Sequence, residues 1–210
     1  MTKVVSFGGN IAKPAAFLSV RRRMDLLLPP SASETDAFVA LGSNLGDRAA
    51  LLRAAVRDLD AHPNVRVTAA SPVYESAAHT LRPDEAQPPY LNAVVRLRTT
   101  LAPEALMAAL LHIERLAGRD RSAARRWAPR TLDLDLLLFD GVTRDTPALT
   151  LPHPRLAARR FVLRPLADLA PNLRLPPPYD TTVRALLDRC PDPLALSPTN
   201  LSLRPRTPDV

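Results

Sequence analysis

The chain contains, at residues 126–139, the sequence RWAPRTLDLDLLLF. The part after Thr131 has the composition of a mostly buried strand. Side chains two residues apart in a strand lie on the same side, roughly 6–7 Å apart. Asp133 and Asp135 therefore point together, while the neighbouring leucines point the other way. Two carboxylates on one face of an apolar strand are costly unless a cation neutralises them. The pattern predicts a site for a hard cation such as Mg²⁺, which usually brings phosphates with it.

A cluster of arginines precedes this strand. Their spacing is not that of an amphipathic helix, so the segment is expected to be a cationic loop. Guanidinium groups bind phosphate oxygens bidentately and neutralise the charge that develops in phosphoryl transfer. The alternative is a solvated basic loop, which leaves the adjacent acidic pair unexplained. The arginines are Arg119, Arg121, Arg125, Arg126 and Arg130.

The composition limits the classes of protein to consider. The chain has 210 residues, of which 46% are hydrophobic, which is enough to build one globular core. The net charge of +7 comes almost entirely from arginine and suits a polyanionic partner such as a nucleotide, a nucleic acid or an anionic membrane. Aromatic residues make up only 4%, which argues against a stacking platform for single-stranded nucleic acid. The single cysteine, Cys190, excludes an internal disulfide and disfavours a zinc site.

Three regions differ in composition. Residues 1–36 form an N-terminal extension that contains Arg21–Arg23 and resembles a transit peptide weakly; an unstructured arm, or a true start at Met24, is the preferred interpretation. Residues 37–190 form the domain. Residues 191–210 are rich in Pro, Ser and Thr and are expected to be an extended or disordered tail. No apolar run reaches the roughly 18 residues of a membrane span.

Within the domain, strand and helix patterns alternate. The turn at 42–47 ends in a helix cap at Asp47, Pro72 is expected to interrupt the second strand pattern, and Pro165 is expected to break or delay the third helix. The βαββαβ order predicts an α+β sandwich with a mostly antiparallel sheet and helices on both sides. The strands are expected at 37–41, 65–74, 91–99 and 132–139, and the helices at 47–59, 103–117, 161–169 and 181–189.

Several separated motifs together resemble one known family, 6-hydroxymethyl-7,8-dihydropterin pyrophosphokinase of the folate pathway. The resemblance covers roughly Asp36 to Cys190, and the arginine motif with Asp-x-Asp is its most specific part. It implies a ferredoxin-like βαββαβ sandwich, in agreement with the order of elements above. The motifs are ALGSNLGD (40–47), QPPYLNAV (87–94), IER (113–115), GR (118–119), RWAPRTLDLD (126–135), LPHPR (151–155) and RRFVL (159–163).

The resemblance also implies a reaction, in which the β,γ-pyrophosphoryl group of ATP passes to the hydroxymethyl oxygen of the pterin and AMP is released. In this family, the positions of Asp133 and Asp135 bind two Mg²⁺ ions between the triphosphate and the attacking oxygen. Arg119 and Arg130 match catalytic arginines that hold the phosphates. Trp127 matches a residue of a loop that closes over the site.

Further residues are matched to substrate contacts. The implied ATP-binding set adds Glu114, Arg126, Trp127, His153 and Arg159 to the two catalytic arginines. The implied pterin-binding set is Tyr90 and Phe161, which sandwich the ring, Asn92, which contacts its polar edge, and the backbone near Ser76. Without the resemblance, Tyr90 and Phe161 would be interpreted as ordinary core aromatics.

The expected protein is a monomeric, cytoplasmic enzyme whose partners are ATP and the pterin, with no nucleic acid and no membrane. One alternative is a basic ferredoxin-like RNA-binding module, which would explain the arginines but not Asp133 and Asp135. Another is a relative that binds nucleotide without turnover. The presence of Arg119, Arg130 and both aspartates argues against it.

Overall fold

The computed structural model describes residues 33–79, 86–119 and 128–203. The described residues from Glu34 to Leu203 form one compact unit. A mixed sheet-and-helix fold results, in the order that the sequence predicts. Its main elements are β1 (Thr35–Ser43), α2 (Arg48–Asp60), β2 (Val65–Ala70), β3 (Tyr74–Ser76), β4 (Tyr90–Thr99), α3 (Pro103–Leu116), β5 (Asp133–Phe139), β6 (Arg144–Asp145), β7 (Thr150–Leu151), a 3₁₀ turn (Leu156–Ala158), α4 (Arg160–Leu169), α5 (Val183–Asp188) and β8 (Ser197–Pro198).

The main sheet is antiparallel throughout its assigned pairs. Its strands lie in the order β5-β1-β4-β3-β8, and β2 also pairs with β4. The long strands β1 and β4 lie side by side in the centre, and β5 flanks β1. This order confirms the predicted ferredoxin-like arrangement. It also makes β5, with its two aspartates, an edge of the main sheet.

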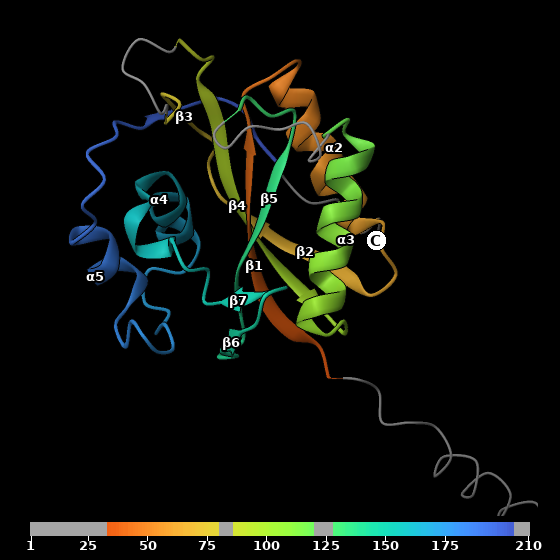
Figure 1. The fold of residues 1–210 in the computed structure, drawn as a ribbon, viewed down its shortest axis with the longest axis vertical. Coiled ribbons are helices and arrows are strands. Elements are labelled where there is room, and N and C mark those ends of the chain that lie inside the picture. The colour runs from red at the N-terminus through yellow and green to blue at the C-terminus, as the bar shows by residue number, and fades with distance from the viewer. Residues whose placement is uncertain (1–32, 80–85, 120–127, 204–210) are drawn as a thin grey trace, which may run out of the picture. The chain divides into compact units, whose positions relative to one another are not determined.

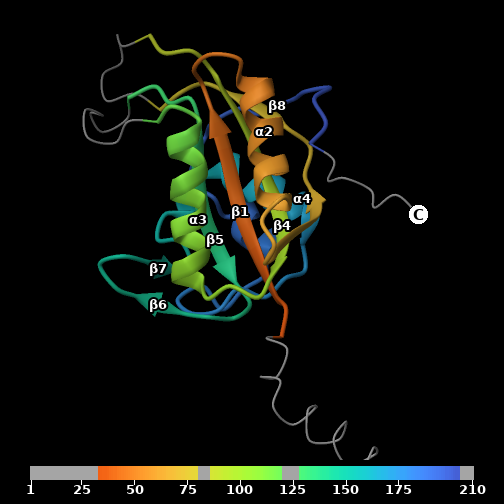
Figure 2. The same cartoon turned by 90° about the vertical axis from the view of Figure 1, so that its right-hand side faces the viewer.

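Helices cover both faces of the sheet, as predicted (Figure 1). Figure 2 shows α2 and α3 side by side over one face, with α4 behind the sheet. The apolar stripe of α2 packs with Leu134 and Leu136 of β5 in one hydrophobic cluster. The other cluster joins α4 and α5 to the opposite face, where β1 contributes Phe38 and Ala40. Because both faces are covered, the middle of β4 is buried on both sides rather than alternating.

Local signals fix several helix ends. The side chain of Asp47 accepts a hydrogen bond from the backbone N–H of Ala50 and caps α2. Pro103 occupies the first turn of α3, where a missing N–H costs nothing. Gly118 follows α3 with a φ of +78°, which glycine adopts without strain. The predicted break at Pro72 is confirmed, since β2 ends at Ala70 and β3 begins at Tyr74.

Pro165 does not break or delay the third predicted helix. Helix α4 begins at Arg160 and continues through Pro165 to Leu169. A proline inside a helix removes one backbone hydrogen bond and costs about 3 kcal/mol. Val162, Leu163 and Leu166 are almost fully buried against the sheet, and their burial offsets that cost.

The segment after Cys190 contributes to the fold up to Leu203. It is partly extended, and β8 pairs with β3 at the edge of the sheet. The backbone N–H and hydroxyl of Thr199 both donate to the carbonyl of Val73. Leu203 is 3% exposed and belongs to the cluster beneath α2 and α3. Among the described residues, no helix is long and apolar enough to cross a membrane.

Leu203→Ala is expected to lower the free energy of unfolding by about 2 kcal/mol or more, because it removes a buried side chain from the core. The matched control is Leu116→Ala, since Leu116 is 69% exposed, and its effect should stay within about 0.5 kcal/mol. Urea denaturation of both variants measures the difference. Equal midpoints for Leu203→Ala and wild type would contradict the placement of this segment in the core.

Candidate functional site

A pocket of about 180 Å³ opens on the α4 side of the sheet. Its floor is a row across three strands, in which Gly42 of β1 pairs with Asp133 of β5 on one side and with Asn92 of β4 on the other. A Cβ at Gly42 would lie 3.7 Å from atoms of both Asp133 and Tyr90. Because Gly42 has no side chain, the space between Asp133 on one edge of the pocket and Asn92 and Tyr90 on the other stays open.

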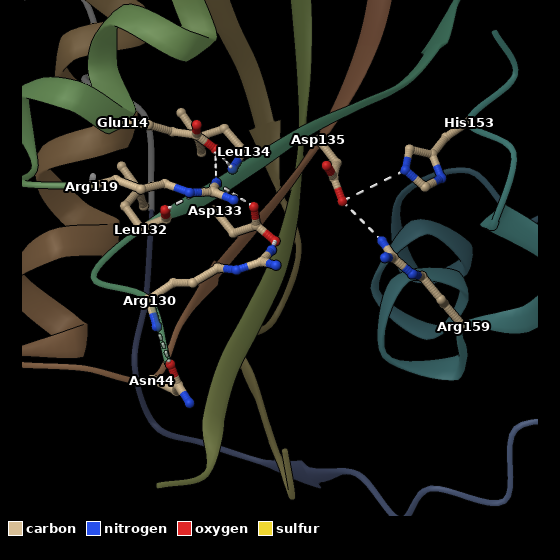
Figure 3. A network of polar contacts seen from close by, with 10 residues as sticks. All are labelled: Asn44, Glu114, Arg119, Arg130, Leu132, Asp133, Leu134, Asp135, His153 and Arg159. Carbon is tan, nitrogen blue, oxygen red and sulfur yellow. Dashed lines mark hydrogen bonds and ion pairs between the residues drawn. The ribbon is translucent and has the colours of Figure 1, made fainter. Parts of the chain in front are cut away.

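Asp133 accepts hydrogen bonds from two guanidinium groups (Figure 3). Arg119 Nη1 donates to Oδ1, and Arg130 Nη1 donates to Oδ2 at 2.7 Å. Arg119 follows α3, whereas Arg130 precedes β5, so the two cations reach the carboxylate from different segments. The sequence predicted that these arginines would act near the aspartates, and the structure brings them together.

Glu114 supports this cluster from behind. Its side chain is 1% exposed. One carboxylate oxygen accepts from Arg119 and, at 2.7 Å, from the backbone N–H of Leu134 on the edge strand β5. The glutamate thus satisfies an edge N–H and holds the guanidinium that contacts Asp133. It is not among the residues that line the pocket.

The charge state of Asp133 follows from its surroundings. Burial alone would raise the pKa of this carboxyl, but the guanidinium groups of Arg130 and Arg119 outweigh burial and hold the pKa below its usual range. Asp133 is therefore ionised at neutral pH, which is the form that binds a metal ion.

Asp135 contacts a separate pair of residues. Arg159 Nη1 donates to its carboxylate at 2.9 Å, and His153 Nε2 lies 3.7 Å from the same oxygen. His153 Nδ1 accepts from the backbone N–H of Arg155 at 3.1 Å, which leaves the ring proton on the nitrogen facing Asp135. Burial lowers the pKa of His153, and Asp135 opposes that effect. Figure 3 shows His153 and Arg159 at the right of the view beside Asp135, and Arg119 and Arg130 at the left beside Asp133.

The residues expected to bind the pterin line the opposite part of the pocket. Tyr90, Asn92, Ser76 and Phe161 are all in its lining. The amide Nδ2 of Asn92 donates to the hydroxyl of Ser76 at 2.9 Å, which fixes the orientation of the amide. The guanidinium carbon of Arg159 lies 5.6 Å from the centre of the Phe161 ring. Burial raises the pKa of Tyr90, so its phenol stays protonated.

Asn44 joins three segments around the site. Its backbone N–H donates to the carbonyl of Arg130 at 3.0 Å, and its Oδ1 accepts from the Arg130 N–H at 2.7 Å. Its Nδ2 donates to the carbonyl of Pro88 at 3.2 Å. Asn44 is buried, with only 1% of its surface exposed. The arginine segment and the segment leading to Tyr90 are thereby tied to the turn after β1.

The donor set fits Mg²⁺ in one specific manner. No group of three or more His, Cys, Asp or Glu side chains arranged for a metal occurs in the described residues. However, Mg²⁺ is usually bound by one or two carboxylates, with waters and substrate phosphates completing its octahedron. Asp133 and Asp135 line the same pocket and supply two carboxylates. They are suited to an ion that arrives with phosphates rather than to an ion enclosed by protein ligands.

Two predicted site residues, Arg126 and Trp127, lie outside the described residues. Sequence reasoning missed other residues of the site. Asn44 lies in the ALGSNLGD motif (40–47), and a polar residue directly after a buried strand could have indicated a role in the site. Arg155 stands in a quoted motif without an assigned role, and it lines the pocket. His79 also lines the pocket, but nothing in its sequence context indicates this.

Glu114→Ala is expected to lower the free energy of unfolding by about 3 kcal/mol or more, because it leaves buried cationic and N–H groups without their acceptor. The control lies in the same helix: Glu104 pairs with Arg144 at 3.4 Å, and its side chain is 52% exposed. Glu104→Ala should cost less than about 1 kcal/mol. Denaturant unfolding compares the two, and similar small losses would refute the supporting role of Glu114.

Comparison with known proteins agrees with this geometry. The chain is 49% identical over 139 residues to 2-amino-4-hydroxy-6-hydroxymethyldihydropteridine pyrophosphokinase of Pseudomonas aeruginosa, covering 66% of this chain and 83% of the relative. It is 45% identical over 133 residues to the Bacillus subtilis protein of the same name, covering 63% and 77%. A crystal structure of Plasmodium falciparum HPPK-DHPS matches with a TM-score of 0.55 at 14% identity, over 79% of this chain and 44% of that chain, which supports the fold.

The family profile of 7,8-dihydro-6-hydroxymethylpterin-pyrophosphokinase matches residues 38–171. This range is well over half of the chain, and it contains both aspartates, the arginines that bind them, and the aromatic residues of the pocket. The chain therefore belongs to the 7,8-dihydro-6-hydroxymethylpterin-pyrophosphokinase family.

Proposed function

We infer that this protein transfers pyrophosphate from ATP to 6-hydroxymethyl-7,8-dihydropterin in folate biosynthesis, giving AMP and the pterin diphosphate. One observation carries the inference. Asp133 and Asp135 line the same pocket as an amide–aromatic wall formed by Asn92, Tyr90 and Phe161, and Gly42 lies between Asp133 and Tyr90. This arrangement suits a reaction between a metal-bound polyphosphate and a planar heterocycle. The family match supports this enzymatic function over the RNA-binding alternative.

In the proposed arrangement, the pterin lies between Tyr90 and Phe161, and Asn92 contacts its polar edge. The hydrogen bond from Asn92 to Ser76 supports this role, because it holds the amide in one orientation before substrate arrives. Aromatic rings on both sides of a planar ligand bury its faces without requiring charge. The hydroxymethyl group would then point across Gly42 toward the aspartates.

Asp133 and Asp135 would hold Mg²⁺, and we propose two ions. When bound, the metal would supply charge neutralisation for the triphosphate and for the attacking and leaving oxygens. The two carboxylates have different arginine partners, which supports two distinct coordination positions rather than one shared position. A cation without phosphates has to compete with these guanidiniums, whereas Mg²⁺ bound to ATP offers them phosphate oxygens as new partners.

In the reaction, the hydroxymethyl oxygen forms a bond to the β-phosphorus, the bond between the β-phosphorus and the α,β-bridging oxygen breaks, and the hydroxyl proton is released. Arg119 and Arg130 stabilise the negative charge that develops as AMP leaves. Arg159 and His153, beside Asp135, are proposed to contact the triphosphate. Arg126 and Trp127 are proposed to complete the ATP site.

We also propose that the enzyme acts as a monomer in the cytoplasm, where ATP is abundant. Size-exclusion chromatography with light scattering measures the mass directly.

Asp133→Ala is expected to lower pterin-dependent AMP formation at least about 100-fold, because it removes a metal ligand and an anchor of both arginines. Asp58→Ala, at an exposed position of α2, is the control and should leave the rate unchanged. AMP release from Mg-ATP is measured with and without the pterin, alongside thermal melting. ADP in place of AMP would mean single-phosphoryl transfer, and a near-normal rate in Asp133→Ala would remove the metal assignment.

Arg130→Ala is expected to lower kcat by about 10²–10³-fold, the usual effect of losing one charge-stabilising donor. Pterin affinity should change little, since the guanidinium binds Asp133 rather than the aromatic wall. Steady-state kinetics and pterin titration in the absence of ATP separate the two effects. Arg57→Ala, in the last turn of α2, is the control. A large loss of pterin affinity with normal kcat would make Arg130 a binding residue only.

A further inference from the structure

Asp192 is a buried carboxylate in the segment that follows α5. Its side chain is 3% exposed. Burying a carboxylate is costly unless hydrogen bonds satisfy it, and here both oxygens are satisfied. Oδ1 accepts from the N–H of Leu194 at 3.0 Å, and Oδ2 accepts from the N–H of Arg160 at 2.9 Å. The carboxylate is thus held by its own segment and directed at the start of α4.

Helix α4 lacks an N-terminal cap of its own. Its N-cap residue, Arg159, makes no side-chain cap hydrogen bond. The first N–H groups of a helix need acceptors, and a negative charge beside them is favourable. Asp192 supplies both from 32 residues further along the chain. Its backbone carbonyl also accepts from Arg160 Nε at 2.9 Å, so the same residue fixes Arg160 twice.

The start of α4 is a wall of the pocket. Arg159 and Phe161, on either side of Arg160, both line it. Arg159 has a second anchor in Asp135, at 2.9 Å. The ring of Phe161 therefore depends more on the helix start than the guanidinium of Arg159 does.

The carboxylate of Asp192 also lies near His79, a pocket-lining residue from a different segment of the chain. His79 Nε2 lies 3.7 Å from Asp192 Oδ2, and the His79 ring lies 5.6 Å from the ring of Phe161, tilted by 50°. His79 lines the pocket. Further along, β8 pairs with β3, the strand that ends at Ser76. The segment from Asp192 to β8 therefore contacts both parts of the pterin-binding wall. One part is the start of α4 with Phe161, and the other is the segment with Ser76 and His79.

We propose that Asp192 is a positioning residue for the pterin-binding wall: it caps α4 so that Phe161 is held in place, and it orients His79 against the same ring. This inference rests on the proposed function for the identity of the ligand. It assigns part of the active-site architecture to the C-terminal segment, outside residues 38–171 that match the family profile.

The test compares full-length wild type with Asp192→Ala, Asp192→Asn and the control Asp188→Asn, which changes an exposed aspartate of α5. Asp192→Ala is expected to raise the KM for the pterin about tenfold, the usual scale for losing a charge-assisted hydrogen bond, while the KM for ATP stays near wild type. Asp192→Asn retains an acceptor for the Arg160 N–H and should fall between. The control should match wild type.

Amide hydrogen exchange over residues 159–163 provides a readout that does not depend on turnover. Faster exchange in Asp192→Ala than in Asp188→Asn, together with the selective rise in pterin KM, supports the proposal. Unchanged exchange, or equal rises in both KM values, overturns it. If wild type forms no pterin-dependent AMP, the proposed function fails, and exchange alone then decides whether Asp192 holds the helix start.

Discussion

The structure depends on the alternation of side chains along β5. Leu134 and Leu136 enter the core beneath α2 and α3, while Asp133 and Asp135 face the pocket on the other side. Because a strand alternates with a period of two, the leucines that anchor the strand also fix the direction of both carboxylates. A one-residue slip would bury the aspartates and expose the leucines. The energy of the hydrophobic core therefore maintains the geometry of the acidic pair.

Two buried or half-buried carboxylates require compensation, and the fold supplies it from separate segments. Arg119 and Arg130 neutralise Asp133, and Arg159 neutralises Asp135. Glu114 accepts from the guanidinium of Arg119, Asn44 holds the backbone of Arg130, and the start of α4 carries Arg159. The cations are thus positioned before any phosphate arrives. Such preorganisation lowers the reorganisation that a polyphosphate substrate would otherwise impose.

Much of the fold could be predicted from local patterns. The leucine–aspartate alternation indicated β5, and the apolar stripe with the Asp47 cap indicated α2; both are where they were expected. The prediction that Pro165 breaks or delays α4 was wrong. Burial of the helix against the sheet outweighs the tendency of proline to interrupt a helix. Strand β8 has only two residues, one of them a proline, so it is too short to show the alternation of apolar and polar residues that predicts a strand.

The candidate site was predictable to the extent that its residues lie in short motifs. Asp133 and Arg130 are three residues apart, so their proximity follows from the sequence. Asp192 and His79 are 113 positions apart, and only the path of the chain brings them together. A buried carboxylate in a proline-rich segment resembles a solvated turn until its partners are known. Long-range contacts of this kind carry no local signature.

The junction at Asn44 restricts which side chains the turn after β1 can accept. The position needs an acceptor for the Arg130 N–H and a donor for the Pro88 carbonyl, both on one short planar group. Aspartate has no donor at neutral pH, serine is too short to reach both partners, and glutamine places its amide one methylene too far. Asparagine meets the requirements of size, charge and polarity together, so this position restricts its side chain although Asn44 does not line the pocket.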